Sequence, residues 1–135
     1  MSICDKLIDL RIMLTTACDG FSVENGSKDT ILSTRTKVLH LLSGRDMTPA
    51  ELIDVLGVAK SNLANLSKAM IEDGVIESYK NADNMRNVYY RVCEKGLEEL
   101  RDYKKALSNI LCGKLKNCID VEENIDRIIM ALRGE

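Results

Sequence analysis

The 135-residue sequence is poor in aromatic residues, at 4%, and it has no tryptophan, one phenylalanine, one histidine and one proline. A core without large aromatic side chains must be built from aliphatic residues, which favours packed helices over a large sheet. Hydrophobic residues make up 45% and charged residues 30%, an ordinary composition for a globular domain and not for a disordered chain. We therefore expect one compact, mostly α (α+β) domain with helical extensions.

Long apolar runs are also missing. No segment approaches the ~20 consecutive apolar residues that a membrane-spanning helix needs. The first residues, from Met1 to Lys6, lack the basic segment and the apolar stretch of a secretion signal. The sequence therefore predicts a cytoplasmic protein without a membrane partner.

The patterns of metal sites and active sites are absent as well. The five cysteines, at positions 4, 18, 93, 112 and 118, form no CxxC pair and no zinc-ligand spacing. Their odd number fits reduced thiols, which we interpret as small buried hydrophobic residues. His40 is flanked by aliphatic residues and is interpreted as a packing residue. No Ser-His-acid order, nucleophile elbow or phosphate loop occurs, so we predict no enzyme, no cofactor and no metal site.

The net charge of −2 gives no general attraction for nucleic acid. Whole-chain charge is a blunt measure, however, because acidic groups can lie far from a binding surface. Between residues 59 and 93, five basic residues accompany four acidic ones, so this segment is nearly neutral. The charge alone leaves a nucleic-acid partner open.

Apolar residues at steps of three and four predict amphipathic helices at both ends of the chain. Residues 3–18 carry one narrow stripe, and a loop is expected over residues 19–29. Residues 94–111 carry a second stripe, and residues 121–132 carry a third after Gly113. These stripes are too many for a domain of about 60 residues to bury alone, and they predict a homodimer built from the terminal helices.

The middle of the chain predicts three helices separated by short turns. The first runs from a Ser33 cap to residue 43, and its buried positions are Val38, Leu39 and Leu42. The second begins at Thr48, where Pro49 and Glu51 complete a capping-box pattern, and it ends at Gly57. Its expected apolar side comprises Leu52, Ile53, Val55 and Leu56. The third runs from Lys60 to Asp73, with a polar side opposite Leu63, Leu66 and Met70.

Residues 75–92 predict a β-hairpin. Two β-prone runs, 75–79 and 88–92, flank the polar segment 80–87, which we expect to be a long tip with Arg86 at its end. Tyr79, Tyr89 and Tyr90 are interpreted as supports of this hairpin. A helix, a three-residue turn, a second helix and a hairpin follow one another in the order of a winged helix-turn-helix, in which the second helix enters the major groove of DNA.

This geometry assigns candidate DNA contacts. Asn62 and Asn65 point the same way and can pair with adenine edges, while Lys68 suits guanine or phosphate. The start of their helix suits phosphate, and Arg86 suits the minor groove or the backbone. The candidate DNA-binding residues are Thr48, Lys60, Ser61, Asn62, Asn65, Lys68, Lys80 and Arg86.

At these residues the sequence resembles a known family. The segments 52–59 (LIDVLGVA), 70–76 (MIEDGVI), 83–86 (DNMR) and 93–96 (CEKG) are similar to those of the MarR family of bacterial and archaeal regulators. The resemblance covers residues 30–105, and the terminal helices match in kind only. It implies winged-helix homodimers with interlocked terminal helices, a recognition helix that carries Ser61 to Lys68, and Arg86 as the wing arginine.

Three positions depart from the pattern of that family. Two residues separate Asp83 from Arg86 where one is usual, Ile53 replaces a small residue, and Ala59 replaces a capping Ser, Thr or Asp. The resemblance also implies a candidate redox-sensing residue, Cys18, although nothing nearby in the sequence is basic enough to activate its thiol.

Together these observations predict a winged helix-turn-helix with N- and C-terminal dimerisation helices. The expected division is a dimerisation helix and loop over 1–29, a DNA-binding domain over 30–93, and dimerisation helices over 94–135. The predicted function is a dimeric repressor that binds a pseudo-palindromic operator in double-stranded DNA and is released by a small-molecule effector or an oxidant. The alternative is a winged-helix module that binds protein without strong DNA binding.

Overall fold

The computed structural model describes the backbone of residues 2–19, 33–114 and 118–135. It describes their side chains except at positions 15–19, 84, 85, 110, 112–114, 118 and 119. The predicted loop at residues 19–29 and the predicted boundary between residues 29 and 30 therefore fall almost wholly outside the described residues.

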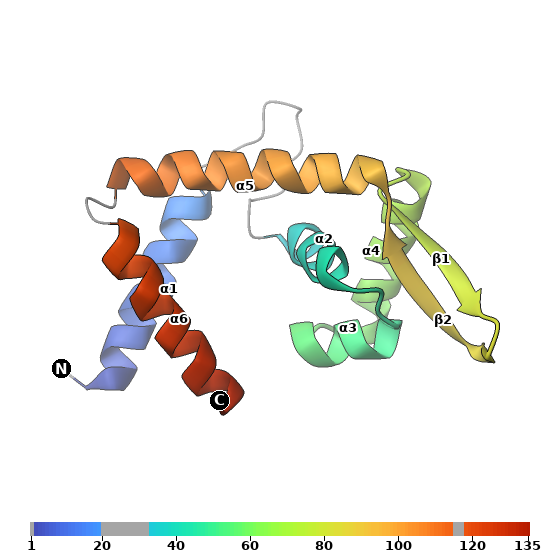
Figure 1. The fold of residues 1–135 in the computed structure, drawn as a ribbon, viewed down its shortest axis with the longest axis horizontal. Helices are drawn as coiled ribbons and strands as arrows, with labels where there is room; N and C mark the ends of the chain where they lie inside the picture. Colours follow the sequence, from blue (N-terminus) through green and yellow to red (C-terminus); the bar gives the residue numbers. More distant parts are fainter. Residues whose placement is uncertain (1, 20–32, 115–117) are drawn as a thin grey trace.

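One long helix, α5 (Glu94–Lys114), spans the molecule (Figure 1). At one end of it lie α1 (Ile3–Asp19) and α6 (Cys118–Arg133), and at the other end lies the group of α2, α3, α4 and a hairpin. These described elements form a mostly helical fold with one small sheet, so the predicted fold class is confirmed. The sequence places the end of this helix near Gly113, and α5 ends one residue later, at Lys114.

The compact end begins with α2 (Thr34–Gly44), which Ser33 caps by accepting a hydrogen bond from the Thr36 backbone N–H. The next helices are α3 (Pro49–Leu56) and α4 (Lys60–Glu72). All three lie within a residue or two of their predicted bounds, because each carries a local start or stop signal in the sequence.

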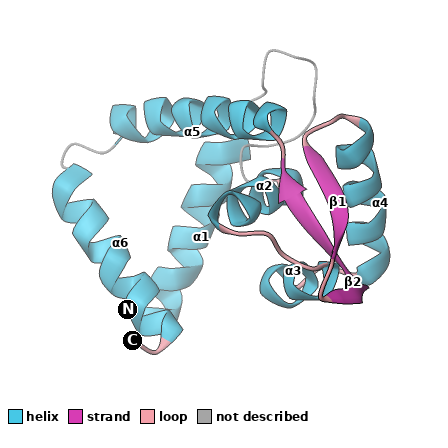
Figure 2. Cartoon of the chain, turned by 45° about the vertical axis from the view of Figure 1, so that its right-hand side comes forward, coloured by secondary structure: helices cyan, strands magenta, loops and turns pink. Residues whose placement is uncertain are grey.

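The hairpin consists of β1 (Ile76–Asn81) and β2 (Asn84–Val92), which pair in antiparallel fashion alongside α4 (Figure 2). The predicted long tip is wrong, because only residues 82 and 83 lie between the strands. The register shifts between Lys80, which faces Val88, and Asn81, which faces Asn84. Residues 85–87 therefore have no partner in this register, and they form an irregularity within β2 instead of a loop.

The core lies between α2, α3, α4, the hairpin and the first half of α5. Its buried members are aliphatic residues and methionine, as the composition predicts: Val38, Leu39, Leu42, Met47, Leu52, Leu63, Met70, Val75, Ile76 and Leu100. The predicted buried positions of α2 are thereby confirmed. Val55 is wrongly predicted to be on the apolar side of α3, since it is 59% exposed. His40 is exposed as well, so its interpretation as a packing residue is wrong.

The two terminal helices expose much of their apolar surface. In α1 the exposed large hydrophobic residues are Ile3, Leu7, Ile8, Leu10, Ile12, Met13 and Leu14. In α6 they are Ile125, Ile128, Ile129, Met130 and Leu132. Soluble monomers rarely expose large apolar patches, so these twelve exposed side chains, which make up the apolar faces of α1 and α6, need an explanation beyond the folding of one chain.

Candidate nucleic-acid interface

The turn between α3 and α4 sets the position of the candidate recognition helix. Thr48 caps α3 by accepting from the Glu51 backbone N–H, and the Glu51 side chain accepts in return from the Thr48 backbone N–H. This is the predicted capping box. Gly57 ends α3 with a φ of 65°, a left-handed conformation that glycine adopts without strain. The chain can therefore reverse in three residues and lay α4 against α3.

Helix α4 has one buried side and one exposed side. Leu63, Ser67 and Met70 are buried against the core. The opposite side carries the five polar residues that the sequence singled out, which we call the reading face, and all of them are exposed: Lys60, Ser61, Asn62, Asn65 and Lys68. Leu66 is only partly buried. The helix thus presents a polar strip away from the core, as its periodicity predicts.

The beginning of α4 has no side-chain cap. Ala59 occupies the N-cap position, and no side chain accepts a hydrogen bond there. The first backbone N–H groups of a helix point out of its end and carry partial positive charge. In α4 these groups lie next to Lys60 and Ser61, so the end of the helix is a suitable place for a phosphate.

The hairpin, or wing, is fixed at its base by a polar and aromatic cluster. The Tyr79 hydroxyl donates to Asp46 Oδ2 at 2.5 Å, and the Arg91 guanidinium lies 4.4 Å from the centre of the Tyr79 ring. Arg91 also pairs with Glu77 at 3.2 Å across the two strands. Tyr89 stacks on Tyr79 with ring centres 5.8 Å apart. The hydrogen bond to Asp46 raises the pKa of Tyr79 above its ordinary value, because it stabilises the protonated phenol.

A second attachment joins the wing to the helices. Met47 and Tyr90 exchange two backbone hydrogen bonds, of 2.8 and 3.3 Å, so the segment before α3 pairs with β2. The Tyr90 hydroxyl lies 3.2 Å from Ser67 Oγ on the buried side of α4. The three tyrosines thus support the wing as predicted. The sequence did not single out Asp46 or Arg91 for this role, although the facing positions of Glu77 and Arg91 in a hairpin could have suggested one pair.

The remaining predicted contacts lie on the wing and before α3. Lys80 is exposed on β1, and Arg86 is exposed within the irregular part of β2 instead of at a loop tip. Thr48 is partly buried, and its hydroxyl is engaged with Glu51. Thr48 therefore has less freedom to contact DNA than the reading face has. The contact of all eight residues with DNA stays a prediction.

Metal-binding groups and reactive thiols are two other kinds of site that the described part of the chain could carry. Among these residues, no three His, Cys, Asp or Glu side chains gather in a group that could hold a metal ion. The side chain of Cys18 lies outside the described residues. Cys4 is exposed, so the interpretation of every cysteine as buried is wrong. Burial raises the pKa of the Cys93 thiol, which disfavours the reactive thiolate. No helix in the described part of the chain has the length and apolar character to cross a bilayer.

Three helices, of which α4 is a candidate recognition helix with an exposed polar side, and a tethered two-stranded wing define a winged helix-turn-helix DNA-binding protein. Comparison of the sequence with known families agrees, since the family described as "Winged helix DNA-binding domain" matches residues 34–111. The chain belongs to this family, whose members are DNA-binding proteins and not enzymes. No curated protein matches the sequence.

Solved structures extend the similarity to almost the whole chain. MarR from E. coli in its apo form has a TM-score of 0.72 and 16% identity, with 95% of this chain and 96% of that chain covered. The transcriptional regulator BldR from Sulfolobus solfataricus has a TM-score of 0.66 and 15% identity, with coverage of 97% and 99%. The adhesin competence repressor AdcR from Streptococcus pyogenes has a TM-score of 0.54 and 17% identity, with coverage of 98% and 96%. The predicted resemblance to MarR is thereby confirmed for the fold.

Proposed function

We propose that the protein is a homodimeric transcriptional regulator that binds a specific DNA sequence through α4 and the wing. The observation that supports this most directly is the exposure of all five side chains of the reading face, opposite the buried side of α4. Polar side chains on a rigid helix, held by a buried opposite side, are what readout of base edges requires.

Each part of the surface has a chemical role in this proposal. Asn62 and Asn65 lie one turn apart, where their amides pair with the N6 and N7 edge of adenine. Lys60 and Ser61 hold a phosphate at the uncapped end of α4, and Lys68 contacts guanine or a phosphate. Lys80 and Arg86 on the wing grip the neighbouring backbone or minor groove. Specificity comes from the asparagines, and most of the affinity comes from the basic groups.

The apolar faces of α1 and α6 support a homodimer. A second copy of the chain, seated on these faces, covers the exposed leucine, isoleucine and methionine side chains of both helices. Two copies related by a two-fold axis present two reading faces. We therefore expect a pseudo-palindromic operator with half-site centres about 34 Å, or one DNA turn, apart.

A groove between α2, α3 and α5 supports control by a small molecule. It has a volume of about 360 Å³, and leucine side chains such as Leu56, Leu100 and Leu107 line it together with His40 and two lysines. This volume is at the lower end of the usual range for ligand pockets. We propose that the protein acts as a repressor, the role that the name of the adhesin competence repressor gives to AdcR, and that a ligand in this groove releases it. A ligand of the groove raises the melting temperature of the wild type and has less effect on a Leu107→Trp variant.

Binding of a protein partner is the second candidate function. Ala59 has no side-chain oxygen with which to contact a phosphate, and the net charge is −2, and both observations favour it over strong DNA binding. In that case the same reading face contacts a protein, and no duplex DNA competes for it.

A gel-shift experiment with the DNA upstream of the protein's own gene tests the proposal. We expect wild-type protein to shift this DNA at about 50 mM salt and to lose affinity steeply at about 200 mM salt. The double variant Asn65→Ala with Arg86→Ala loses the shift but elutes as a dimer. The matched control is Arg101→Ala, which removes an exposed arginine from α5 and leaves the shift intact.

Two outcomes contradict the proposal. Wild-type protein that shifts neither this DNA nor any duplex from a random pool favours the protein-binding alternative. A double variant that binds as tightly as the wild type places the DNA-binding surface elsewhere.

A further inference from the structure

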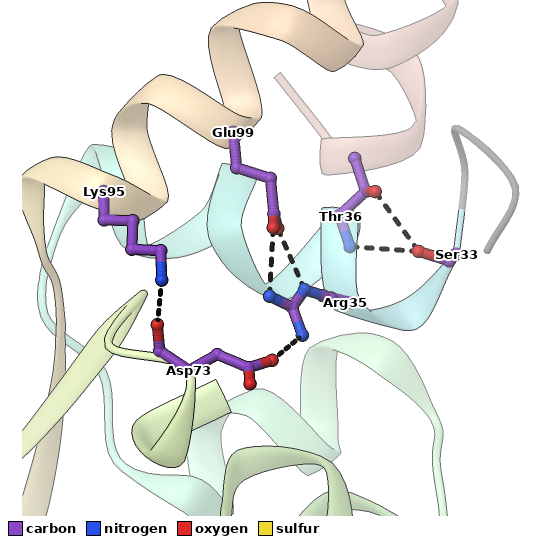
Figure 3. A network of polar contacts seen from close by, with 6 residues as sticks. All are labelled: Ser33, Arg35, Thr36, Asp73, Lys95 and Glu99. Atoms are coloured by element: carbon purple, nitrogen blue, oxygen red, sulfur yellow. Dashed lines mark hydrogen bonds and ion pairs between the residues drawn. The ribbon is translucent and has the colours of Figure 1, made fainter. Parts of the chain in front are cut away.

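A polar cluster joins the end of α4 to α5 through the first turn of α2 (Figure 3). The Arg35 guanidinium donates to both carboxylate oxygens of Glu99 on α5, at 2.9 and 3.0 Å. Its remaining nitrogen donates to Asp73 Oδ2 at 2.7 Å. Lys95 Nζ, also on α5, donates to the Asp73 carbonyl oxygen at 2.7 Å. We call these four residues the Arg35 clasp.

Asp73 makes the clasp relevant to α4. It is the C-cap of this helix, and its backbone N–H donates to the Ala69 carbonyl at 2.9 Å. Arg35 holds the carboxylate of Asp73 while Lys95 holds its carbonyl, so the cap has two separate links to the rest of the protein. The C-terminal end of α4 is therefore attached to α5 by side chains as well as by the intervening hairpin.

The Arg35 side chain is suited to fix the angle between the helices that it joins. It is only 15% exposed, and it makes a bidentate pair with one partner and a third hydrogen bond with the other. A planar guanidinium held at three points has little rotational freedom. A lysine that makes a single contact would keep that freedom. The ion pair between Arg101 and Glu94 on α5 differs, because its side chains are 65% and 75% exposed and both belong to the same helix. Exposed pairs of that kind contribute little.

Helix α5 continues from the clasp toward α1 and α6, the helices with the exposed apolar faces (Figure 1). We infer that Arg35 is a positioning residue that fixes the angle between the reading helix α4 and the long helix α5, and with it the separation of the two reading faces in the dimer. This inference rests on the proposed function. It concerns which half-site spacing the protein accepts, and not whether α4 contacts DNA.

The test uses a duplex that the wild-type protein enriches from a random pool, with one or two base pairs then inserted between its half-sites. Each base pair moves one half-site by about 3.4 Å and rotates it about the DNA axis. We expect the wild type to lose affinity on the order of tenfold per insertion. Arg35→Met keeps the apolar stem of the side chain and removes the charge. We expect this variant to lose only about twofold in affinity for the duplex per inserted base pair. Arg101→Met removes an arginine from the exposed pair and keeps the wild-type preference.

The spacing preference separates positioning from mere stability, because a destabilised protein binds every duplex more weakly by the same factor. Glu99→Gln should reproduce Arg35→Met, and the double variant should be no more tolerant of insertions than either single variant. If Arg35→Met does not fold, Arg35→Lys replaces it, since lysine keeps the charge and loses the bidentate geometry. A variant that keeps the full wild-type loss per insertion overturns the inference.

A DNA-free measurement distinguishes this inference from the proposed function. If the wild type enriches no duplex, the proposed function fails. Hydrogen exchange then tests whether the Arg35 clasp holds the C-terminal end of α4. We expect backbone amides at residues 73–75 to exchange about tenfold faster in Arg35→Met, and those of α3 to be unchanged. Unchanged exchange at residues 73–75 overturns the inference.

Discussion

Replacement of Gly96 by alanine tests how closely α5 packs on the winged helix. Gly96 is the third residue of α5 and is buried. A β-carbon at this position would overlap the Val75 carbonyl oxygen, and it would meet Val92 Cγ2 at 2.8 Å and Leu39 Cδ2 at 3.1 Å. The first of these is a clash with backbone, and that carbonyl also accepts a hydrogen bond from the Cys93 N–H at 2.9 Å. The clash therefore cannot be relieved by a side-chain rotation.

The size of the effect follows from two opposing contributions. Alanine is better than glycine in a helix by up to about 1 kcal/mol. Overpacking of a core typically costs about 1–3 kcal/mol, and an overlap with backbone belongs at or above the upper end. We expect a net loss of about 2–3 kcal/mol in the free energy of unfolding. For a chain of this length, this corresponds to a fall in melting temperature of roughly 10 °C.

The assay is urea and thermal unfolding followed by far-ultraviolet circular dichroism, at one protein concentration because the proposed dimerisation would add to stability. The control is Gly44→Ala at the end of α2, where a β-carbon meets nothing within 4 Å. This control should unfold at the wild-type temperature or slightly above it. A Gly96→Ala protein within about 0.5 kcal/mol of the wild type would refute the close approach of α5 to Val75.

Three further predictions concern the capping box, the wing and the terminal helices. The hydrogen bond from Arg45 lowers the pKa of Glu51. The Glu51 carboxylate therefore stabilises the fold fully at pH values above its ordinary pKa of about 4.3, and this stabilisation is lost as the pH falls through the lowered pKa. Urea titrations should show Glu51→Gln less stable than the wild type at about pH 7 and equal to it near pH ~2. The hydrogen bond to Asp46 raises the pKa of Tyr79, so the absorbance titration of the wild type should contain a phenol that ionises above the ordinary value of about 10 and that is missing from Tyr79→Phe; identical high-pH titrations would contradict the Asp46 contact. Ile128→Glu places a charge on the apolar face of α6, so sedimentation should show monomers at concentrations where the wild type is dimeric, and an unchanged dimer would exclude α6 from the interface.

The helices of the compact end could be predicted because their signals are local. Ser33, the Thr48 capping box and Gly57 act within four residues of themselves, and the spacing of Leu63 and Met70 determines which side of α4 is exposed. The exposed reading face followed from the same periodicity. These features needed no knowledge of distant contacts.

The errors arise where packing or irregular pairing overrides a local pattern. The polar run at residues 80–87 has turn-forming composition, but most of it pairs or bulges within the strands, so Arg86 lies in β2. Val55 and His40 look like core residues, but they line or border a groove that only the placement of α5 creates.

Apart from the facing Glu77 and Arg91 of the hairpin, long-range side-chain pairs could not be predicted. Arg35 and Glu99 are 64 residues apart, and Tyr79 and Asp46 are 33 residues apart. Nothing in the local sequence of these residues indicates a partner, because a charged or phenolic side chain is equally compatible with solvent. The clasp and the wing cluster therefore emerge only from the fold.

The affinity of Asn65→Ala for two duplexes tests the DNA-reading role of α4 most directly. Fluorescence anisotropy at one salt concentration compares the duplex enriched by the wild type with a scrambled duplex of the same length. We predict that Asn65→Ala binds the enriched duplex more weakly by about 1–3 kcal/mol, or roughly 5- to 150-fold, and binds the scrambled duplex as the wild type does. Unchanged affinity for both duplexes, or an equal loss on both, would show that Asn65 does not read a base.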